Sequence, residues 1–160
     1  MSDRFPGDII IGGRIPRRLR DDLAGMTAEQ GVGINWQATL DRADIRAAIE
    51  AAAAKGGTVL FTDDAALNGK FEELEGWLTR HGIDFDRHSD ARYEYSAQNV
   101  YGRGRRCPVE MRSDQCYADM VSAAMVRQIL ESRSPVDRRL AILSRLAAVP
   151  PALTPIVLTD

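Results

Sequence analysis

The chain has 160 residues, of which 44% are hydrophobic and 28% charged, enough to bury one core and form one compact domain. Its 21 basic and 23 acidic residues leave a net charge of -2, which removes the bulk electrostatic argument for nucleic-acid binding but not for a local basic patch. No run approaches the roughly 18 apolar residues of a membrane span, and residues 1–8 lack the basic-then-apolar order of a signal peptide, so we expect a cytoplasmic protein without a membrane partner.

The N-terminal third of the chain predicts one strand followed by two helices. Residues 8–11 form a β-branched run stopped by two glycines, which is typical of a buried strand. Pro16 suits the first turn of a helix, and the apolar stripe of that helix fades near Gly31. Asp41 is placed to cap the second helix, and glycines 56–57 end it.

The middle of the chain predicts further strands around one helix. Residues 58–62 are rich in β-branched and aromatic side chains and predict a strand. The helix that follows is expected to end at Gly82. From Ile83 the apolar period changes to two, and residues 102–105 supply a hairpin turn. Pro108 places the last strand at a sheet edge, because proline cannot donate to a strand ladder.

Two helices and a tail are predicted for the C-terminal part. Ser113 or Asp114 is expected to cap the first helix. Its inward residues recur at helical spacing: Tyr117, Met120, Val121, Ala124, Met125 and Ile129. Ser134 is placed to cap the second helix just before Pro135, and a proline-rich extended tail ends the chain.

This order of elements predicts an α+β or α/β fold: a single mixed sheet of about four or five strands, with helices packed on it and two C-terminal helices. Residues 1–112 are expected to form an α/β core with a hairpin. Residues 113–160 are expected to form the helical pair and tail, within one compact unit. Cys107 and Cys116 fit neither redox-motif nor zinc-site spacing, so we predict no cofactor and expect reduced thiols, with a disulfide left open as the alternative.

The first candidate site is the turn between the first strand and the first helix. Arg14, Arg17 and Arg18 surround free backbone N–H groups there, and the positive end of a helix could help them bind an anion. The turn lacks both the P-loop and the dinucleotide-binding patterns, so nucleotide chemistry is not implied. The alternative is a tight turn before a solvated, arginine-rich helix face.

The second candidate is a set of polar side chains that alternate along one predicted strand: Asp84, Asp86, His88 and Asp90. Side chains two apart on a strand share one face at about 7 Å, close enough for carboxylates and an imidazole to share Mg²⁺ or Mn²⁺. This would suit a metal-dependent enzyme. The alternative is a half-exposed strand whose acids face water or pair with Arg87 and Arg92.

The third candidate is a hairpin where tyrosines and arginines interleave: Tyr93, Tyr95, Tyr101, Arg103, Arg105 and Arg106. Aromatic rings stack on bases or pack at protein interfaces, and guanidinium groups bind phosphate or carboxylate, so this segment suits either class of partner. The alternative is a solvated hairpin tip. If this turn lies beside the first candidate site, the six arginines of the two turns form one anion-binding or nucleic-acid-binding patch.

Residues 12–16, 71–75, 81–90 and 93–95 resemble segments of small uncharacterised bacterial proteins found on phages and plasmids. The similarity covers about two thirds of the chain, from Asp8 to about Arg106, and it indicates no particular activity. The resemblance implies a protein of a mobile element. Small acidic proteins of such elements often occupy a surface of a host or defence protein, and some imitate nucleic acid. This chain departs from the mimic pattern, since its 19 arginines nearly cancel its acids.

We therefore expect a non-catalytic cytoplasmic protein that acts by protein–protein contact, as a mobile-element accessory or counter-defence (anti-CRISPR-like) protein. The motivation is a set of interaction-type features without a recognisable reaction centre. The alternatives are an arginine-mediated phosphate or nucleic-acid binder and a divalent-metal enzyme that uses the Asp84, Asp86 and His88 strand. The pattern also permits a homodimer.

Overall fold

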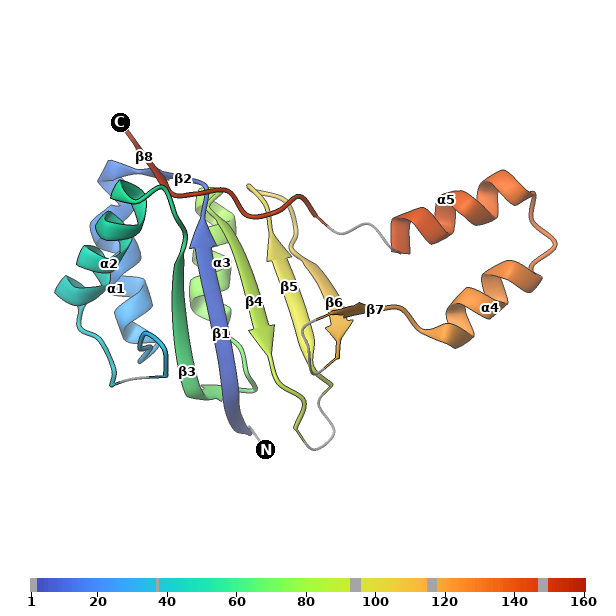
Figure 1. Ribbon diagram of the computed structural model, residues 1–160, viewed down its shortest axis with the longest axis horizontal. Helices are drawn as coiled ribbons and strands as arrows, with labels where there is room; N and C mark the ends of the chain where they lie inside the picture. The colour runs from blue at the N-terminus through green and yellow to red at the C-terminus, as the bar shows by residue number, and fades with distance from the viewer. Residues whose placement is uncertain (1–2, 37, 93–95, 115–117, 147–149) are drawn as a thin grey trace.

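An antiparallel sheet of six strands forms the middle of the molecule (Figure 1). The computed structural model describes residues 3–36, 38–92, 96–114, 118–146 and 150–160. The main sheet has the order β3-β1-β4-β5-β6-β7. Its strands are β1 (Arg4–Gly12), β3 (Val59–Leu67), β4 (Asp84–Ser89), β5 (Gln98–Gly102), β6 (Val109–Ser113) and β7 (Asp119–Met120). A small parallel pair joins β2 (Arg14–Pro16) to β8 (Val157–Thr159).

The predicted α+β class is confirmed, but the predicted mixed sheet of four or five strands is wrong in its details. Every pairing in the main sheet is antiparallel. The strand predicted to stop near Thr62 continues to Leu67, because β3 stays paired to β1 as far as Arg4. The last strand of the main sheet, β7, has only two residues, which is too short for any periodic signal.

Three helices pack on one face of the sheet and at its β3 edge (Figure 1). They are α1 (Arg20–Glu29), α2 (Arg42–Ala54) and α3 (Glu72–His81). Asp41 caps α2 as predicted, since its Oδ1 accepts from the Asp44 backbone N–H at 2.9 Å. Gly82 ends α3 in the left-handed conformation at φ 72°. The helix predicted to start at Pro16 instead begins with a 3₁₀ turn (Arg17–Leu19) after β2.

Alternation along the strands separates the two faces of the sheet. Ile9, Ile11 and Phe85 are fully buried on the face that α1, α2 and α3 cover. The residues between them point to the opposite face, which we call the open face. The open face holds the sites described below.

The last two helices form an arm that projects away from the sheet (Figure 1). The arm, residues 123–146, contains α4 (Ala123–Glu131) and α5 (Val136–Leu146). The predicted cap at Ser113 or Asp114 is wrong: Ser113 belongs to β6, and the Ser122 hydroxyl accepts from the Met125 backbone N–H at 3.4 Å. Of the residues predicted to face inward, Met120, Val121, Ala124 and Met125 are exposed and Ile129 is half-buried. Met125 is 45% exposed. Helical periodicity identifies an apolar stripe but not what covers it. Tyr117 lies outside the described residues.

After the arm, the tail returns to the body of the protein. Ile156 is buried in the main core, and the Gly13 backbone N–H donates to the Thr154 carbonyl at 2.9 Å. The predicted division at residue 112 stays a prediction: β7 joins the main sheet, and β8 packs beside β2.

Replacing Gly12 with alanine is expected to push the tail away from β1. A Cβ at Gly12 would overlap the Thr154 carbonyl and the Leu153 side chain. We expect a loss of about 1–3 kcal/mol in the free energy of unfolding, together with faster hydrogen exchange of the Val157 amide, which donates to the Gly13 carbonyl. Unchanged protection of that amide would contradict the described contact.

Candidate functional site

Asp84, Asp86 and His88 lie on the open face, so the predicted alternation is confirmed. Each is already engaged. The Gly104 backbone N–H donates to Asp84 Oδ1 at 2.7 Å, Arg103 Nη1 lies 2.6 Å from Asp86 Oδ1, and His88 Nε2 lies 3.4 Å from Asp90 Oδ1. Among the described residues, no group of three or more His, Cys, Asp and Glu is arranged to hold a metal ion. The metal-enzyme hypothesis gains nothing from this geometry.

The Gly12 turn and the Gly102 turn do lie at the same end of the sheet, but an acid separates them. Gly12 pairs with Asp84, and Asp84 accepts from the second turn. Arg103 is turned inward: besides Asp86, it donates to the carbonyls of Phe85, Gly102 and Pro151.

Of the other predicted anion-binding residues, Arg17 lies 3.4 Å from Asp160 through Nε and Oδ1. Exposed positions are occupied by Arg14, Arg18, Arg105 and Arg106. The predicted six-arginine patch is therefore incomplete, because the Arg103 guanidinium is bound to Asp86 and to backbone carbonyls of the protein. Anion binding by the remaining arginines stays a prediction.

The Tyr101 side chain is half-buried and hydrogen-bonded within the protein, and it is not presented on an exposed recognition loop. Its hydroxyl donates to the Asp119 carboxylate, at 2.9 Å from Oδ1 and 3.0 Å from Oδ2. Burial, followed by this hydrogen bond, raises the pKa of Tyr101 to about 12, so the hydroxyl stays a donor at neutral pH. Tyr93 and Tyr95 lie outside the described residues.

A hydrogen-bonded chain links His88 to β7 across the open face. Asn99 Nδ2 donates to Asp119 Oδ1 at 2.8 Å, and Asn99 Oδ1 lies 2.7 Å from His88 Nδ1. Because Asn99 Oδ1 can only accept, the proton in this bond is on His88 Nδ1. Asn99 and Tyr101 together hold Asp119, and therefore the short strand β7, against the sheet.

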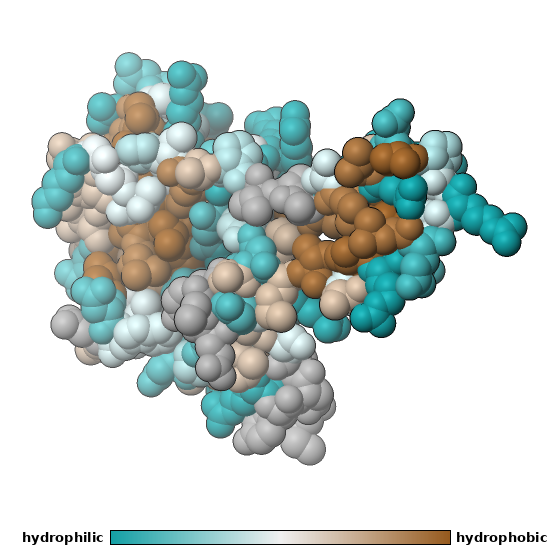
Figure 2. All heavy atoms as spheres, turned by 45° about the vertical axis from the view of Figure 1, so that its right-hand side comes forward, coloured by the Kyte–Doolittle hydropathy of each residue, from teal (hydrophilic) through white to brown (hydrophobic). Residues whose placement is uncertain are grey.

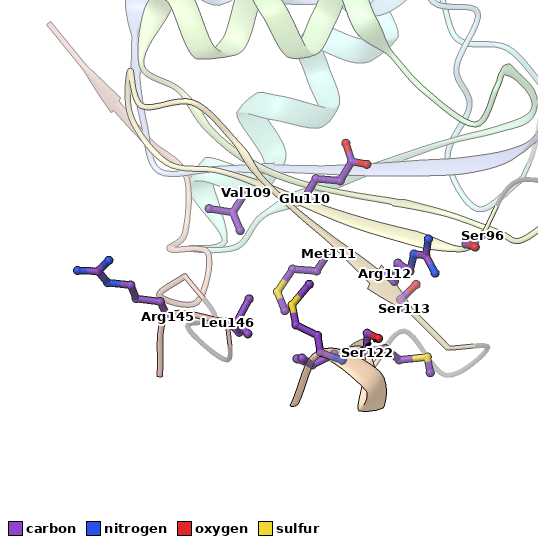
Figure 3. Close-up of a pocket in the computed structure, with 12 residues that line it drawn as sticks. Ser96, Val109, Glu110, Met111, Arg112, Ser113, Ser122, Arg145 and Leu146 are labelled. Carbon is purple, nitrogen blue, oxygen red and sulfur yellow. Dashed lines mark hydrogen bonds between the residues drawn. The ribbon is translucent and has the colours of Figure 1, made fainter. Parts of the chain in front are cut away.

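An apolar groove runs between β6 and the arm, with a volume of about 730 Å³ (Figure 3). Its apolar lining comes from Val109, Met111, Met120, Val121, Met125 and Leu146. Three of the five methionines of the chain lie here. Methionine is flexible and polarisable and fits partner surfaces of irregular shape. Arg112, Arg145 and Glu110 stand among the apolar residues.

The apolar surface continues along the arm, where brown spheres gather around a hollow in Figure 2. The two helices line this hollow with Met125, Ile129, Ile142 and Leu146, and Arg138 stands beside them. Other large apolar side chains of the arm are also exposed, including Val136 at 58% and Leu140 at 56%. Contiguous exposed apolar surface of this kind marks interaction sites in soluble proteins.

The arm and the rest of the protein carry opposite net charge. Five arginines and two acids give residues 123–146 a net charge of +3, so the remainder of the chain carries -5 to reach the total of -2. The arm is therefore both apolar and basic.

Sequence reasoning missed the groove because its parts are far apart in the chain. The 120–129 apolar repeat is the one local signal for this surface, and by itself it predicts a buried helix face. Nothing local indicated that Met111 of β6 and Leu146 of α5 would line one surface.

Comparison with family models, curated proteins and solved structures finds no match for this chain. None of the described helices is long and apolar enough to cross a membrane.

Asp8, next to His88 on the open face, is expected to lower stability at neutral pH. Burial is the main cause that raises the pKa of Asp8 above its ordinary value of 3.8. The folded state thus favours the protonated acid. The contribution of Asp8 to the free energy of unfolding is therefore fully present below the unfolded pKa and is lost as the pH rises through the folded pKa.

We therefore expect Asp8→Asn to raise the melting temperature at pH 7, with the difference from the unmodified protein closing as the pH falls toward 3.8. Thermal unfolding followed across pH measures this. Asp64→Asn, at an exposed position of β3, is the matched control and should change little. A lower melting temperature for Asp8→Asn at pH 7 would contradict the expectation.

Proposed function

We propose that this protein is a non-catalytic binding protein that holds an acidic, amphipathic helix of a partner protein in the groove between β6 and the arm. The observation that carries the proposal is the methionine-lined groove, which continues onto the exposed apolar face of a basic arm.

The apolar lining favours a helix. An amphipathic helix places apolar side chains at i, i+3, i+4 and i+7 on one stripe, and such a stripe fits an apolar groove. The floor of the groove is the paired strand β6, and its wall comes from Met125 of α4 and Leu146 of α5. Burial of this surface by a partner is favourable at roughly 25 cal/mol per Å² of apolar area.

The charge favours an acidic partner over a second copy of this chain that meets it arm to arm. Two copies that met arm to arm would bring two surfaces of +3 together. Like charges at an interface oppose association, whereas complementary charges speed association and select partners. Arg112 and Arg145 beside the groove, and Arg138 beside the hollow of the arm, are placed to meet carboxylates on the flanks of a bound helix.

We further propose that this protein is an accessory protein of a phage or plasmid, as the resemblance implies. In the cytoplasm it would use the groove to bind a helix of a host or defence protein. Binding in the groove requires only that this helix has an apolar stripe and acidic flanks.

A pair of synthetic helical peptides tests the proposal. Both carry the same leucine stripe; one has glutamates along its flanks and the other lysines. Fluorescence anisotropy should show that the glutamate peptide binds, that salt weakens its binding, and that the lysine peptide binds at least about tenfold more weakly.

Two arm variants localise the binding. Met125→Glu places a charge in the groove and should abolish binding of the glutamate peptide. Ser144→Glu places the same charge at an exposed position of α5 and should preserve most of it. Failure of the glutamate peptide to bind would overturn the proposal. A homodimer that Met125→Glu dissociates would overturn it as well, because a second copy would then fill the groove.

A further inference from the structure

We propose a second, separate site: the hollow between Trp36 and the open face of β1 and β4 binds a small organic cation, an ammonium or guanidinium group on an apolar body. The hollow has a volume of about 340 Å³. Its lining includes Asp8, Asp86, Arg87 and His88, together with the apolar side chains of Ile10, Trp36 and Leu60.

The backbone holds the Trp36 ring beside Asp8. The Trp36 backbone N–H donates to Thr62 Oγ1 at 2.8 Å, and Thr62 is the direct cross-strand neighbour of Asp8. Asn35 and Trp36 both have positive φ, at 52° and 59°, a conformation that non-glycine residues adopt at a cost. The indole is nevertheless 51% exposed. A large aromatic side chain thus forms an accessible wall of the hollow.

The opposite wall is polar and buried. His88 and Asn99, which line this wall, are each less than 9% exposed, so their positions are set by packing within the sheet. Ile10 and Leu60 lie side by side on β1 and β3 and supply an apolar floor. A ligand with an apolar body and one polar end matches this division.

The charge of the hollow selects a cation. Asp86 is already paired with Arg103, whereas none of the described residues places an Arg, Lys or His nitrogen within 4.0 Å of the Asp8 carboxylate. A bound cation would neutralise Asp8 and could also lie over the Trp36 ring, the aromatic face that attracts cations most strongly. Arg87 also lines the hollow, but its guanidinium is engaged by Glu75 and Ser89. An anionic ligand would therefore meet repulsion from Asp8 and Asp86.

Titration with n-butylammonium and n-butylguanidinium ions, followed by NMR of the two tryptophan indole N–H signals, tests this site. Trp36 should shift and saturate, whereas Trp77, which is buried in α3, should not move. The neutral twin n-butanol should bind at least about tenfold more weakly, because a charge-assisted contact to Asp8 is lost.

Asp8→Asn should weaken the binding of both cations at least about tenfold, and Asp64→Asn should leave it unchanged. Met125→Glu should also leave it unchanged, which separates this site from the groove. Equal shifts with n-butanol, unaltered affinity in Asp8→Asn, or parallel shifts of Trp36 and Trp77 would each overturn the proposal.

Discussion

Replacing Arg87 with alanine should lower the free energy of unfolding by about 3–5 kcal/mol. Arg87 is 2% exposed, on the face of β4 that the helices cover. Its Nε lies 3.2 Å from Glu75 Oε1 of α3, and its Nη1 donates to Ser89 Oγ at 2.8 Å. Alanine would leave the mostly buried Glu75 carboxylate without its cation. Urea denaturation of the variant measures the loss.

A double variant separates the ion pair from simple loss of packing. Breaking a buried pair by removing one partner is costly, whereas replacing both partners with apolar side chains is often neutral. Arg87→Met combined with Glu75→Leu should therefore recover most of the stability that Arg87→Ala loses. A loss below about 1 kcal/mol for Arg87→Ala would show an exposed, weak pair instead.

Replacing Gly102 with alanine is the second substitution expected to have a large effect. Gly102 of β5 is the direct partner of Phe85 on β4, and a Cβ there would overlap the Phe85 ring. Phe85 is fully buried, so its ring is surrounded by the core. Overpacking of this kind costs about 1–3 kcal/mol, and we expect the upper part of that range.

The matched control is Gly76→Ala on the exposed side of α3, where a Cβ meets no atom within 4 Å. Alanine inside a helix is favoured over glycine, so this variant should gain roughly 0.5–1 kcal/mol. Calorimetry of both variants measures the contrast. Equal melting temperatures for Gly102→Ala and the unmodified protein would show that the aromatic ring is not fixed as described.

Local signals predicted the elements that depend on neighbouring residues. The Asp41 cap, the Gly82 stop and the alternation of Asp84, Asp86 and His88 were all readable, because each follows from chemistry within a few positions. The same signals predicted α4 as an amphipathic helix but placed its start too early. They could not show that its apolar side would remain uncovered.

Contacts between distant segments decided the rest. Arg87 was named as an alternative partner for the acids of its own strand, yet it pairs with Glu75 of α3. Arg103 was expected in an exposed turn, yet it reaches the tail at Pro151. Trp36 is brought over the open face by its bond to Thr62. These arrangements depend on strand order and on the return of the tail to β2, which no local pattern encodes.

The two proposed sites occupy one face of the sheet but use different chemistry. The groove is apolar with basic flanks, and the Trp36 hollow is aromatic and acidic. Asp119 lies between the two sites. Its carboxylate accepts hydrogen bonds from Asn99 and Tyr101, and the next residue in the chain, Met120, lines the groove.

The most direct measurement of the central claim is a charge exchange along the groove and the adjoining hollow of the arm. The double variant Arg138→Glu with Arg145→Glu reverses the charge beside the apolar lining and leaves the lining itself intact. We predict that this variant prefers the lysine-flanked peptide, whereas the unmodified protein prefers the glutamate-flanked one. An identical order of affinities for the two proteins would contradict the proposed binding of an acidic helix.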